Sequence, residues 1–330
     1  MQALKGSGPA VLEATDAAQF AGLFDAVVHA IGEVLVGKPD AIRLALICLL
    51  SEGHLLLWDV PGTGKTTLAK SLAAVVSGTT ARIQFTPDLL PSDVTGVTIY
   101  DQQTAHFEFH KGPIFASIVL ADEINRASPK TQAALLEVME ESKVTVDGIS
   151  HEVGNPFMVI ATQNPIEQAG TYRLPEAQLD RFLMKTSLGY PDHAATVEIL
   201  AGATTKAHAR TVGPKITTAA VSDMAELAAT VHTDPAILDY VARLAESTRT
   251  TPETTVGVSV RGCLALVRAS RTWAAAHGRH FVIPDDVKDL AEPVLAHRIL
   301  LDAEAEFSGT SVAGVLHRIL GEVTPPERRQ

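Results

Sequence analysis

Two spacings of apolar residues alternate along the first 190 residues of the chain. Short continuous apolar runs predict buried strands, whereas apolar residues three and four positions apart predict helices. We predict strands over residues 54–58, 81–85, 118–122, 157–162 and 184–188, and helices over 16–34, 39–50, 66–76 and 129–141. Apolar strands that alternate with helices are typical of an α/β fold, in which a parallel sheet lies between layers of helices.

Two further segments carry strand patterns but lie outside this alternation. Residues 96–100 and 106–110 predict one pair of short strands, and residues 143–146 and 149–153 predict another. The second pair flanks an Asp-Gly dipeptide, which strongly favours a two-residue hairpin turn. We therefore expect two inserts in the core domain, near 96–110 and 143–153.

After about residue 190 the pattern becomes helical. Apolar spacing predicts helices over 194–203, 222–231, 236–249, 260–276, 284–297 and 312–320. Four residues of the types that cap helix N-termini lie at or near the starts of these helices, namely Asp192, Ser222, Asp234 and Ser259. Since one domain has roughly 100–200 residues, we predict two domains, a core over 1–190 and a smaller all-helical domain over 191–330.

Composition narrows the classes of function. The chain has 330 residues and a formal net charge of −11, which disfavours non-specific binding to nucleic acid, although a local basic groove stays open. Its two cysteines, Cys48 and Cys263, are too few for a disulfide framework and favour a reducing compartment. The N-terminus lacks a signal-peptide pattern, and charged residues interrupt the most apolar stretch, 41–58. We expect a cytoplasmic protein without a membrane span.

The strongest chemical signal lies between the first predicted strand and the helix that follows it. Glycines let backbone N–H groups close around phosphate oxygens, a lysine reaches the β- and γ-phosphates, and a hydroxyl binds Mg²⁺. One position departs from the usual pattern, because Asp59 stands where the full motif has glycine. Gly62, Gly64, Lys65 and Thr66 supply these groups. We predict a nucleotide-binding loop made of Asp59, Val60, Pro61, Gly62, Thr63, Gly64, Lys65, Thr66 and Thr67.

Polar residues end two other predicted strands. Asp122, at the end of the third strand, is a candidate ligand for Mg²⁺ together with Thr66. The adjacent Glu123 is a candidate base for the attacking water, and Asn164, after the fourth strand, is a candidate to bind the γ-phosphate or that water. Each has a plainer alternative, because acidic residues often cap turns and Asn-Pro often starts them.

The order of these parts resembles an AAA+ ATPase, and more narrowly the MoxR family. Similar stretches cover nearly all of the chain from about Val36, including the acidic segment 122–141 and the segment from Thr171 to Phe182. The segment that ends at Phe182 contains Leu-Asp-Arg-Phe and is very specific to the family. The resemblance implies a P-loop NTPase core, a helical lid, ATP and Mg²⁺ as cofactors, and ATP hydrolysis.

The resemblance also assigns roles outside the phosphate loop. Val36 and Gly37 match the segment that contacts adenine, although Lys38 stands where a glutamine is usual. Asn164 matches the residue called sensor 1. Arg261 matches sensor 2 on the lid and would then bind nucleotide; the alternative is an exposed arginine at a helix start.

A trans-acting arginine is a further implication of the resemblance. Arg181 matches an arginine finger, which is offered to the nucleotide of a neighbouring subunit and makes hydrolysis depend on assembly. Arg173 and Arg126 are rivals for this role. The alternative for Arg181 is an ion pair within the chain, with Asp180 or Asp122. The predicted catalytic residues are Lys65, Glu123, Asn164 and Arg181.

By resemblance, the chain is an ATP-hydrolysing chaperone or remodelling ATPase that works as an oligomeric ring, expected to be a hexamer. Proteins with a von Willebrand factor A domain are implied as partners, and maturation of enzymes by metal or cofactor insertion is implied as a role. Two other classes stay open, a nucleic-acid-directed motor of the same architecture and a non-hydrolysing scaffold that assembles with ATP. The inserts match substrate-contacting loops of related ATPases, or else they are static surface hairpins.

Overall fold

The chain forms two compact units, which we call the sheet unit and the helical unit. The computed structural model describes residues 12–103, 105–165, 171–172, 174–204 and 212–327. The sheet unit consists of Ala26–Phe182 and Thr186–Ser222, and the helical unit of Met1–Asp25, Leu183–Lys185 and Asp223–Gln330. The two units are therefore interleaved along the chain, whereas the sequence predicts a single boundary between residues 190 and 191, which stays a prediction.

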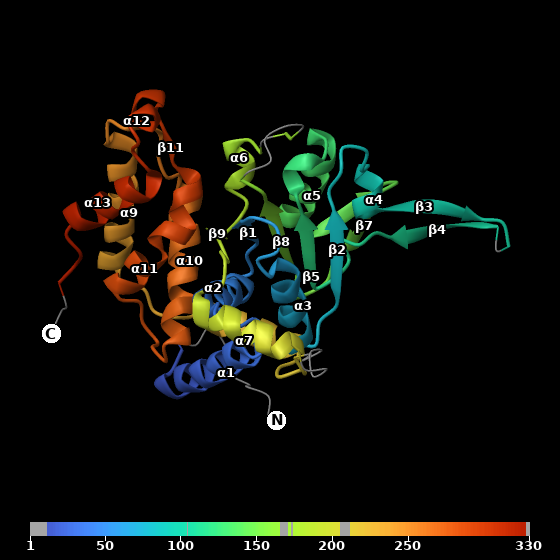
Figure 1. Ribbon diagram of the computed structural model, residues 1–330, viewed down its shortest axis with the longest axis horizontal. Helices are drawn as coiled ribbons and strands as arrows, with labels where there is room; N and C mark the ends of the chain where they lie inside the picture. The colour runs from blue at the N-terminus through green and yellow to red at the C-terminus, as the bar shows by residue number, and fades with distance from the viewer. Residues whose placement is uncertain (1–11, 104, 166–170, 173, 205–211, 328–330) are drawn as a thin grey trace. The chain divides into compact units, whose positions relative to one another are not determined.

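A five-stranded sheet is the centre of the α/β fold (Figure 1). Its strands are β1 (Leu55–Trp58), β2 (Thr80–Gln84), β5 (Ile118–Asp122), β8 (Met158–Gln163) and β9 (Met184–Thr186). They lie in the order β2-β5-β8-β1-β9, and the pairs β2/β5, β5/β8 and β8/β1 are parallel. Every residue of β5 and β8 is buried, as expected of inner strands in a parallel sheet. The predicted parallel α/β core is confirmed.

The helices between the strands start where the sequence has helix-start signals. Pro129 occupies the first turn of its helix, and the Ser128 hydroxyl accepts the backbone N–H of Thr131 at 3.4 Å. The described helices of the sheet unit are α2 (Pro39–Leu50), α3 (Lys65–Val75), α4 (Pro91–Thr95), η1 (Ile124–Arg126), α5 (Pro129–Glu141), α6 (Glu176–Leu179) and α7 (His193–Thr204). Two more, α1 (Ala14–Gly32) and α8 (Thr218–Ala229), run from one unit into the other.

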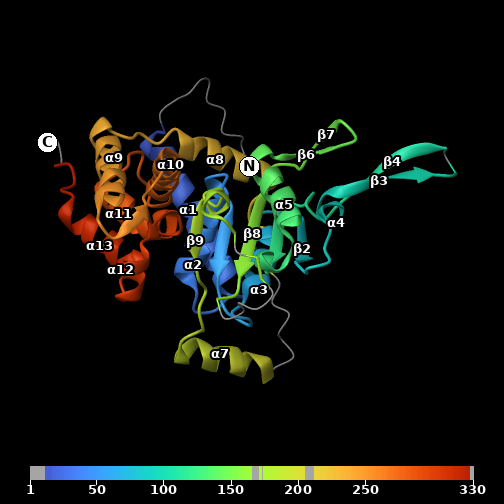
Figure 2. The ribbon, with the colours of Figure 1, turned by 90° about the horizontal axis from the view of Figure 1, so that it is seen from above.

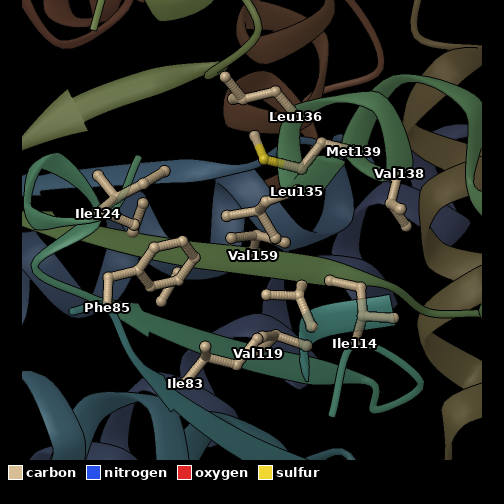
Figure 3. Packing of buried hydrophobic residues seen from close by; sticks show 14 of the residues in the cluster. Ile83, Phe85, Ile114, Val119, Ile124, Leu135, Leu136, Val138, Met139 and Val159 are labelled. Atoms are coloured by element: carbon tan, nitrogen blue, oxygen red, sulfur yellow. The ribbon is translucent and has the colours of Figure 1, made fainter. Parts of the chain in front are cut away.

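One buried apolar cluster joins strands of the sheet to α5 (Figure 3). Ile83 comes from β2, Val119 from β5 and Val159 from β8, and alternate residues of a strand share one face of the sheet. Phe85, just after β2, is fully buried in the same cluster. Helix α5 covers this face with Leu135, Leu136, Val138 and Met139. The cluster holds β5 and β8 in place, and the polar ends of these two strands carry the site described below.

Two antiparallel hairpins extend from the sheet unit beside β2 and α5 (Figures 1 and 2). They are formed by β3 (Gly96–Asp101) with β4 (His106–Lys111), and by β6 (Lys143–Val146) with β7 (Ile149–Glu152). The turn at Asp147 and Gly148 has φ of 51° and 79°, the left-handed conformation that such a two-residue turn requires. The pairing of these strands confirms the two predicted hairpins. The hairpins also contact each other, because the ring of Phe109 in β4 stacks on that of His151 in β7 with centroids 4.1 Å apart.

The C-terminal part of the chain is mainly helical, as predicted. Its elements are α9 (Pro235–Thr250), β10 (Thr254–Val256), α10 (Val260–Ala276), α11 (Pro284–Leu295), η2 (Ala296–Arg298), β11 (Leu300–Leu301), α12 (Ala303–Phe307) and α13 (Val312–Glu322). The sequence did not predict the two-stranded sheet of β10 and β11, because two or three residues are too few to show a strand period. Among the helices that the structure describes, none is long and apolar enough to cross a membrane.

Three of the predicted helix caps are present and one is wrong. Asp192, Asp234 and Ser259 accept backbone N–H groups at the starts of their helices. Ser222 lies inside α8, which begins one turn earlier, and the Thr217 hydroxyl accepts the backbone N–H of Ala220 there. A threonine caps a helix as a serine does, so the pattern alone could not decide between them.

Candidate active site

The predicted phosphate loop joins β1 to α3. Gly62 and Gly64 have φ of +85° and +101°, a backbone conformation that favours glycine. A Cβ atom on Gly64 would lie 2.8 Å from Cδ1 of Leu35, so a side chain there would also clash. Gly64 is the N-cap of α3 and has no side chain to bond the first N–H groups of the helix. Those N–H groups and the helix dipole therefore make an anion-binding end.

Lys65 folds back along the loop that precedes it. Its ammonium group donates to the backbone oxygens of Asp59 at 3.2 Å and of Val60 at 3.0 Å. The hydroxyl of the buried Thr63 donates to the Val60 oxygen at 3.4 Å. The loop thus combines a lysine ammonium, glycine N–H groups and a helix N-terminus at one place, the combination that binds phosphate.

Asp59, the departure from the usual loop motif, has a structural partner. Its carboxylate is buried and accepts the backbone N–H of Leu188 at 2.5 Å and that of Gly189 at 3.2 Å. Glycine could not make these bonds. The sequence predicts Asp59 as part of the nucleotide site, and the structure shows its side chain bound to the segment after β9.

The predicted adenine segment lies next to the phosphate loop and to the same segment after β9. Leu35 contacts Gly64, and Gly37 has φ of +75° and lies so close to Ala195 that a Cβ atom on Gly37 would be 2.6 Å from the Ala195 Cβ. The Lys38 ammonium donates to the backbone oxygen of Tyr190 at 2.6 Å. Segments 35–38, 59–65 and 188–195 therefore meet, and the structure brings the predicted base and phosphate regions together.

The order of the strands brings three predicted polar residues to one edge. Because parallel strands have their carboxyl ends at the same edge, the loop after β1, Asp122 at the end of β5 and Asn164 after β8 lie along it. Strand β8 lies between the other two. Asp122 and Asn164 are both buried. This edge is the site that the sequence predicts from three separate segments.

The two acidic residues at this edge are held by neighbouring polar groups. Asp122 Oδ2 accepts from the Arg82 guanidinium at 2.6 Å, and Asp122 Oδ1 accepts from the Thr162 hydroxyl at 2.6 Å. Glu123 Oε2 accepts from Gln84 at 2.9 Å and from Arg126 at 3.0 Å. Glu123 itself has φ 58° and ψ 50°, the left-handed conformation that non-glycine residues rarely adopt. Both carboxylates are thus oriented by hydrogen bonds.

Three of these partners were missed by the sequence reasoning. Arg82 and Gln84 lie two residues apart in β2, and Thr162 lies in β8 two residues before Asn164. The sequence does show these polar residues at the ends of apolar strands. The spacing of apolar residues predicts the strands, however, and does not predict what a polar side chain at the end of a strand binds. Their pairing with Asp122 and Glu123 depends on which strands are neighbours.

The predicted Mg²⁺ ligands suit that ion. Thr66 and Asp122 offer hydroxyl and carboxylate oxygens, and Mg²⁺ is commonly held by one or two protein oxygens together with substrate phosphates. Within the described part of the chain, no group of three or more His, Cys, Asp or Glu residues could hold a metal by itself. The donor set therefore fits an ion that arrives with a nucleotide.

The candidate trans-acting arginines occupy different places. Arg181 follows α6, and its guanidinium donates to the Leu136 backbone oxygen at 2.5 Å and pairs with Glu140 at 3.0 Å, both on α5. An ion pair within the chain therefore exists, with Glu140 as a partner that the sequence did not suggest. Arg126 pairs with Glu123 at 3.0 Å, and Arg173 lies outside the described residues. Which arginine acts on a neighbour stays a prediction.

Arg261 lies in the first turn of α10, in the helical unit. Its side chain is exposed, and the Ser259 hydroxyl caps this helix through the N–H of Gly262 at 3.2 Å. A cation at a helix N-terminus is unfavourable for the helix dipole unless an anion is near. The predicted contact of Arg261 with nucleotide stays a prediction.

Two protein families match parts of this chain. Residues 54–184 match the ATPase family associated with various cellular activities (AAA), and residues 246–319 match the AAA lid domain. The first match covers the phosphate loop, the acidic pair and Asn164. The fold and the site define a P-loop nucleotide-binding protein of the AAA+ class.

Relatives that align with most of this chain indicate which family within the AAA+ class it belongs to. Chaperone MoxR1 of Mycobacterium tuberculosis is 40% identical over 91% of this chain and 81% of its own length. Protein MoxR of Paracoccus denitrificans is 34% identical over 84% and 88%, and the uncharacterized protein YeaC of Bacillus subtilis is 46% identical over 93% and 96%. A crystal structure of a candidate ATPase from Cytophaga hutchinsonii has a TM-score of 0.89 and 36% identity, covering 95% of this chain and 98% of its own. The chain belongs to the MoxR family of AAA+ ATPases.

Proposed function

We propose that this chain hydrolyses ATP with Mg²⁺ and uses the cycle to remodel or mature partner proteins. One observation carries the proposal. A phosphate-binding loop and a pair of oriented carboxylates, Asp122 and Glu123, lie at the same edge of a parallel sheet. A site that only binds nucleotide has no need for an oriented glutamate next to the candidate metal ligand.

Each predicted residue has a distinct task in this proposal. Lys65 and the N–H groups at the start of α3 bind the phosphates, and Thr66 and Asp122 hold Mg²⁺, which neutralises charge on the phosphates when it is bound. Glu123 orients a water and takes its proton. Asn164 donates to the γ-phosphate or orients that water.

Hydrolysis is proposed to require a neighbouring subunit. An arginine supplied in trans stabilises the charge of the transition state and is worth roughly 10³–10⁵ in rate. Arg181 is the first choice, and binding to a neighbour would require it to leave Glu140 and the Leu136 oxygen. Arg261 of the helical unit would contact the same nucleotide from its own chain. A hexameric ring is the assembly we propose.

The partners are proposed from the relatives. One relative is named a chaperone. Partners with a von Willebrand factor A domain and a role in metal or cofactor insertion follow from the family resemblance.

We also propose a cytoplasmic location. Both cysteines are thiols rather than halves of a disulfide, as in a reducing compartment, and burial raises the pKa of the Cys263 thiol, so this thiol is protonated at neutral pH.

Phosphate release per chain, measured across a wide range of protein concentration, tests the proposal. We expect the rate to rise with concentration and then saturate, because a neighbour completes the site. Glu123→Gln should retain ATP binding and lose turnover. Tight ATP binding without phosphate release at any concentration, and with partner present, would instead support the non-hydrolysing scaffold.

A mixing experiment identifies the trans-acting arginine. Arg181→Ala and Glu123→Gln are each expected to be inactive alone. When the two are co-expressed, about a quarter of the interfaces combine an intact Glu123 with an intact Arg181 from the neighbour, so activity should return. No recovery would remove Arg181 from the role, and the same mixture with Arg173→Ala or Arg126→Ala tests the rivals.

The nucleic-acid motor is the second candidate and has a direct test. Addition of single- and double-stranded DNA or RNA at low salt should leave the hydrolysis rate unchanged, because the net charge of −11 opposes binding to phosphate backbones. Stimulation by nucleic acid that disappears as salt is raised would favour the motor.

A further inference from the structure

The Thr162 hydroxyl lies between the two acidic residues of the site. It donates to Asp122 Oδ1 at 2.6 Å and accepts the backbone N–H of Glu123 at 2.9 Å. A hydroxyl has one hydrogen, so donation to the carboxylate leaves its lone pairs to accept the N–H. Thr162 is 1% exposed, so its hydroxyl is shielded from solvent. One side chain therefore holds the carboxylate of the first acid and the backbone of the second.

The backbone of Glu123 needs a partner of this kind. Its φ of 58° and ψ of 50° are disfavoured for a residue with a side chain. The N–H bond to Thr162 stabilises the peptide between Asp122 and Glu123 in this conformation. The direction in which the Glu123 side chain leaves the strand follows from it, and that side chain reaches Gln84 and Arg126.

The register of the strands produces the contact. β5 and β8 pair in parallel, with Ala121 opposite Ala161, so Asp122 and Thr162 come next along their strands. Asn164 follows two residues later, and residues two apart share one side of a strand. The same strand thus supplies Thr162 to the acids and Asn164 to the edge of the site.

We propose that Thr162 is a positioning residue for ATP hydrolysis. It acts through Asp122, which it orients toward the Mg²⁺ position, and through Glu123, whose backbone it holds in the left-handed conformation. The inference rests on the function proposed above, since it assigns Thr162 to carboxylates that hold the metal and activate the water. If Thr162 had only a structural role, its replacement would lower the stability of the fold, and the two carboxylates would hold the metal and activate the water as well as before.

Thr162→Val is the test variant, because valine has nearly the same shape and no hydroxyl. We expect kcat to fall about 10- to 100-fold, since a bond to a charged group is lost and the partly buried N–H of Glu123 loses its partner. The Kd for ATP measured without added divalent metal should stay within about threefold, because the phosphate loop and α3 are untouched. Thr162→Ser retains the hydroxyl and should restore kcat to within about threefold of the wild type.

Thr131→Val is the matched control. Thr131 is also a fully buried threonine of the sheet unit, and its hydroxyl donates to the Leu89 backbone oxygen at 2.7 Å. This variant should lose thermal stability comparably to Thr162→Val and should not show a selective loss of kcat. Far-ultraviolet circular dichroism of all three variants checks that each is folded.

A second measurement does not depend on turnover. Electron paramagnetic resonance of Mn²⁺ added to the protein–ATP complex of Glu123→Gln, with and without Thr162→Val, reports the metal position. We expect Thr162→Val to weaken Mn²⁺ binding several-fold and to change the spectrum, because Asp122 Oδ1 loses its hydrogen bond and only Arg82 still orients the carboxylate.

Two results would overturn the inference: unchanged Mn²⁺ binding together with an unchanged kcat, or a kcat loss that Thr162→Ser does not rescue. If the wild type itself released no phosphate, the proposed function would fail, and the Mn²⁺ spectra would still show whether Thr162 orients Asp122 at the metal position.

Discussion

Asp59 joins the phosphate loop to the segment after β9, and its removal should weaken the sheet unit measurably. The carboxylate is 4% exposed and accepts the N–H groups of Leu188 and Gly189 at 2.5 and 3.2 Å. We consider three substitutions, to Ala, Asn and Gly. The glycine variant restores the usual loop motif. It therefore tests whether the Asp59 carboxylate stabilises the fold in a loop that still has the residues that phosphate binding requires.

The contacts set the expected size of the loss. A hydrogen bond to a charged acceptor contributes about 1.5–3 kcal/mol, and the larger value applies to the buried Leu188. The N–H of the more exposed Gly189 can bond to water when the carboxylate is gone. Release of a buried negative charge offsets part of the loss. We expect Asp59→Ala to lower the free energy of unfolding by about 2–4 kcal/mol, and Asp59→Asn by about 1 kcal/mol, because its amide oxygen still accepts.

Urea unfolding followed by tryptophan fluorescence is the assay. Trp58 precedes Asp59 and reports on this region, and a Trp273→Phe background removes the other tryptophan. Asp93→Ala is the matched control, since its exposed carboxylate accepts one N–H, from Leu90 at 2.8 Å, and should cost at most about 1 kcal/mol. Affinity for ADP, measured in parallel, should fall in Asp59→Ala.

The glycine variant gives the refuting result. If Asp59→Gly unfolds at the same urea concentration as the wild type and binds ADP equally well, the two N–H bonds do not stabilise the loop. Glycine also gives the unfolded chain more backbone freedom, which by itself lowers the free energy of unfolding by about 0.5–1 kcal/mol. This effect adds to the loss of the two hydrogen bonds, so it could not hide that loss behind an unchanged midpoint.

Three other perturbations test different parts of the structure. Hydrogen bonds from Arg318, from the Thr251 hydroxyl and from the backbone lower the pKa of Glu253 from 4.5 to about 2, so the stabilisation is complete above about pH 4.5 and is lost as the pH falls toward 2. Arg318→Gln removes the largest of these causes and should reduce the acid dependence of the urea midpoint. Ser128→Ala should lower the free energy of unfolding by about 1 kcal/mol through loss of the α5 cap, and Ser128→Asp should restore it. Phe85→Ala should cost about 3–5 kcal/mol by leaving a cavity in the cluster of Figure 3, and Phe85→Leu much less; equal costs would contradict dense packing there.

The local structure of the phosphate loop could be predicted in full, because the loop is contiguous in sequence. The loop from Asp59 to Thr66 needs only a strand before it, a helix after it and glycines at two positions, and all of these are visible in the pattern. The acidic pair and Asn164 could be named because each ends an apolar run. Their neighbours Arg82, Gln84 and Thr162 could not, since nothing near them in the sequence indicates an acidic partner.

The sequence by itself determined the local elements. Apolar spacing, Pro and Gly positions and the Asp-Gly turn depend on residues a few positions apart, so the five strands of the main sheet, the main helices and both hairpins follow from them. The pattern also determined which strand ends carry polar groups.

Only the tertiary structure decided which of those ends meet. The order β2-β5-β8-β1-β9 brings Thr162 to Asp122, 40 residues away, and the folding of the segment after β9 brings Leu188 to Asp59, 129 residues away. The partner of Arg181 on α5 was settled in the same way. These contacts depend on strand order, register and packing of the whole sheet unit, which are properties of many distant residues together and leave no mark in a short stretch of sequence.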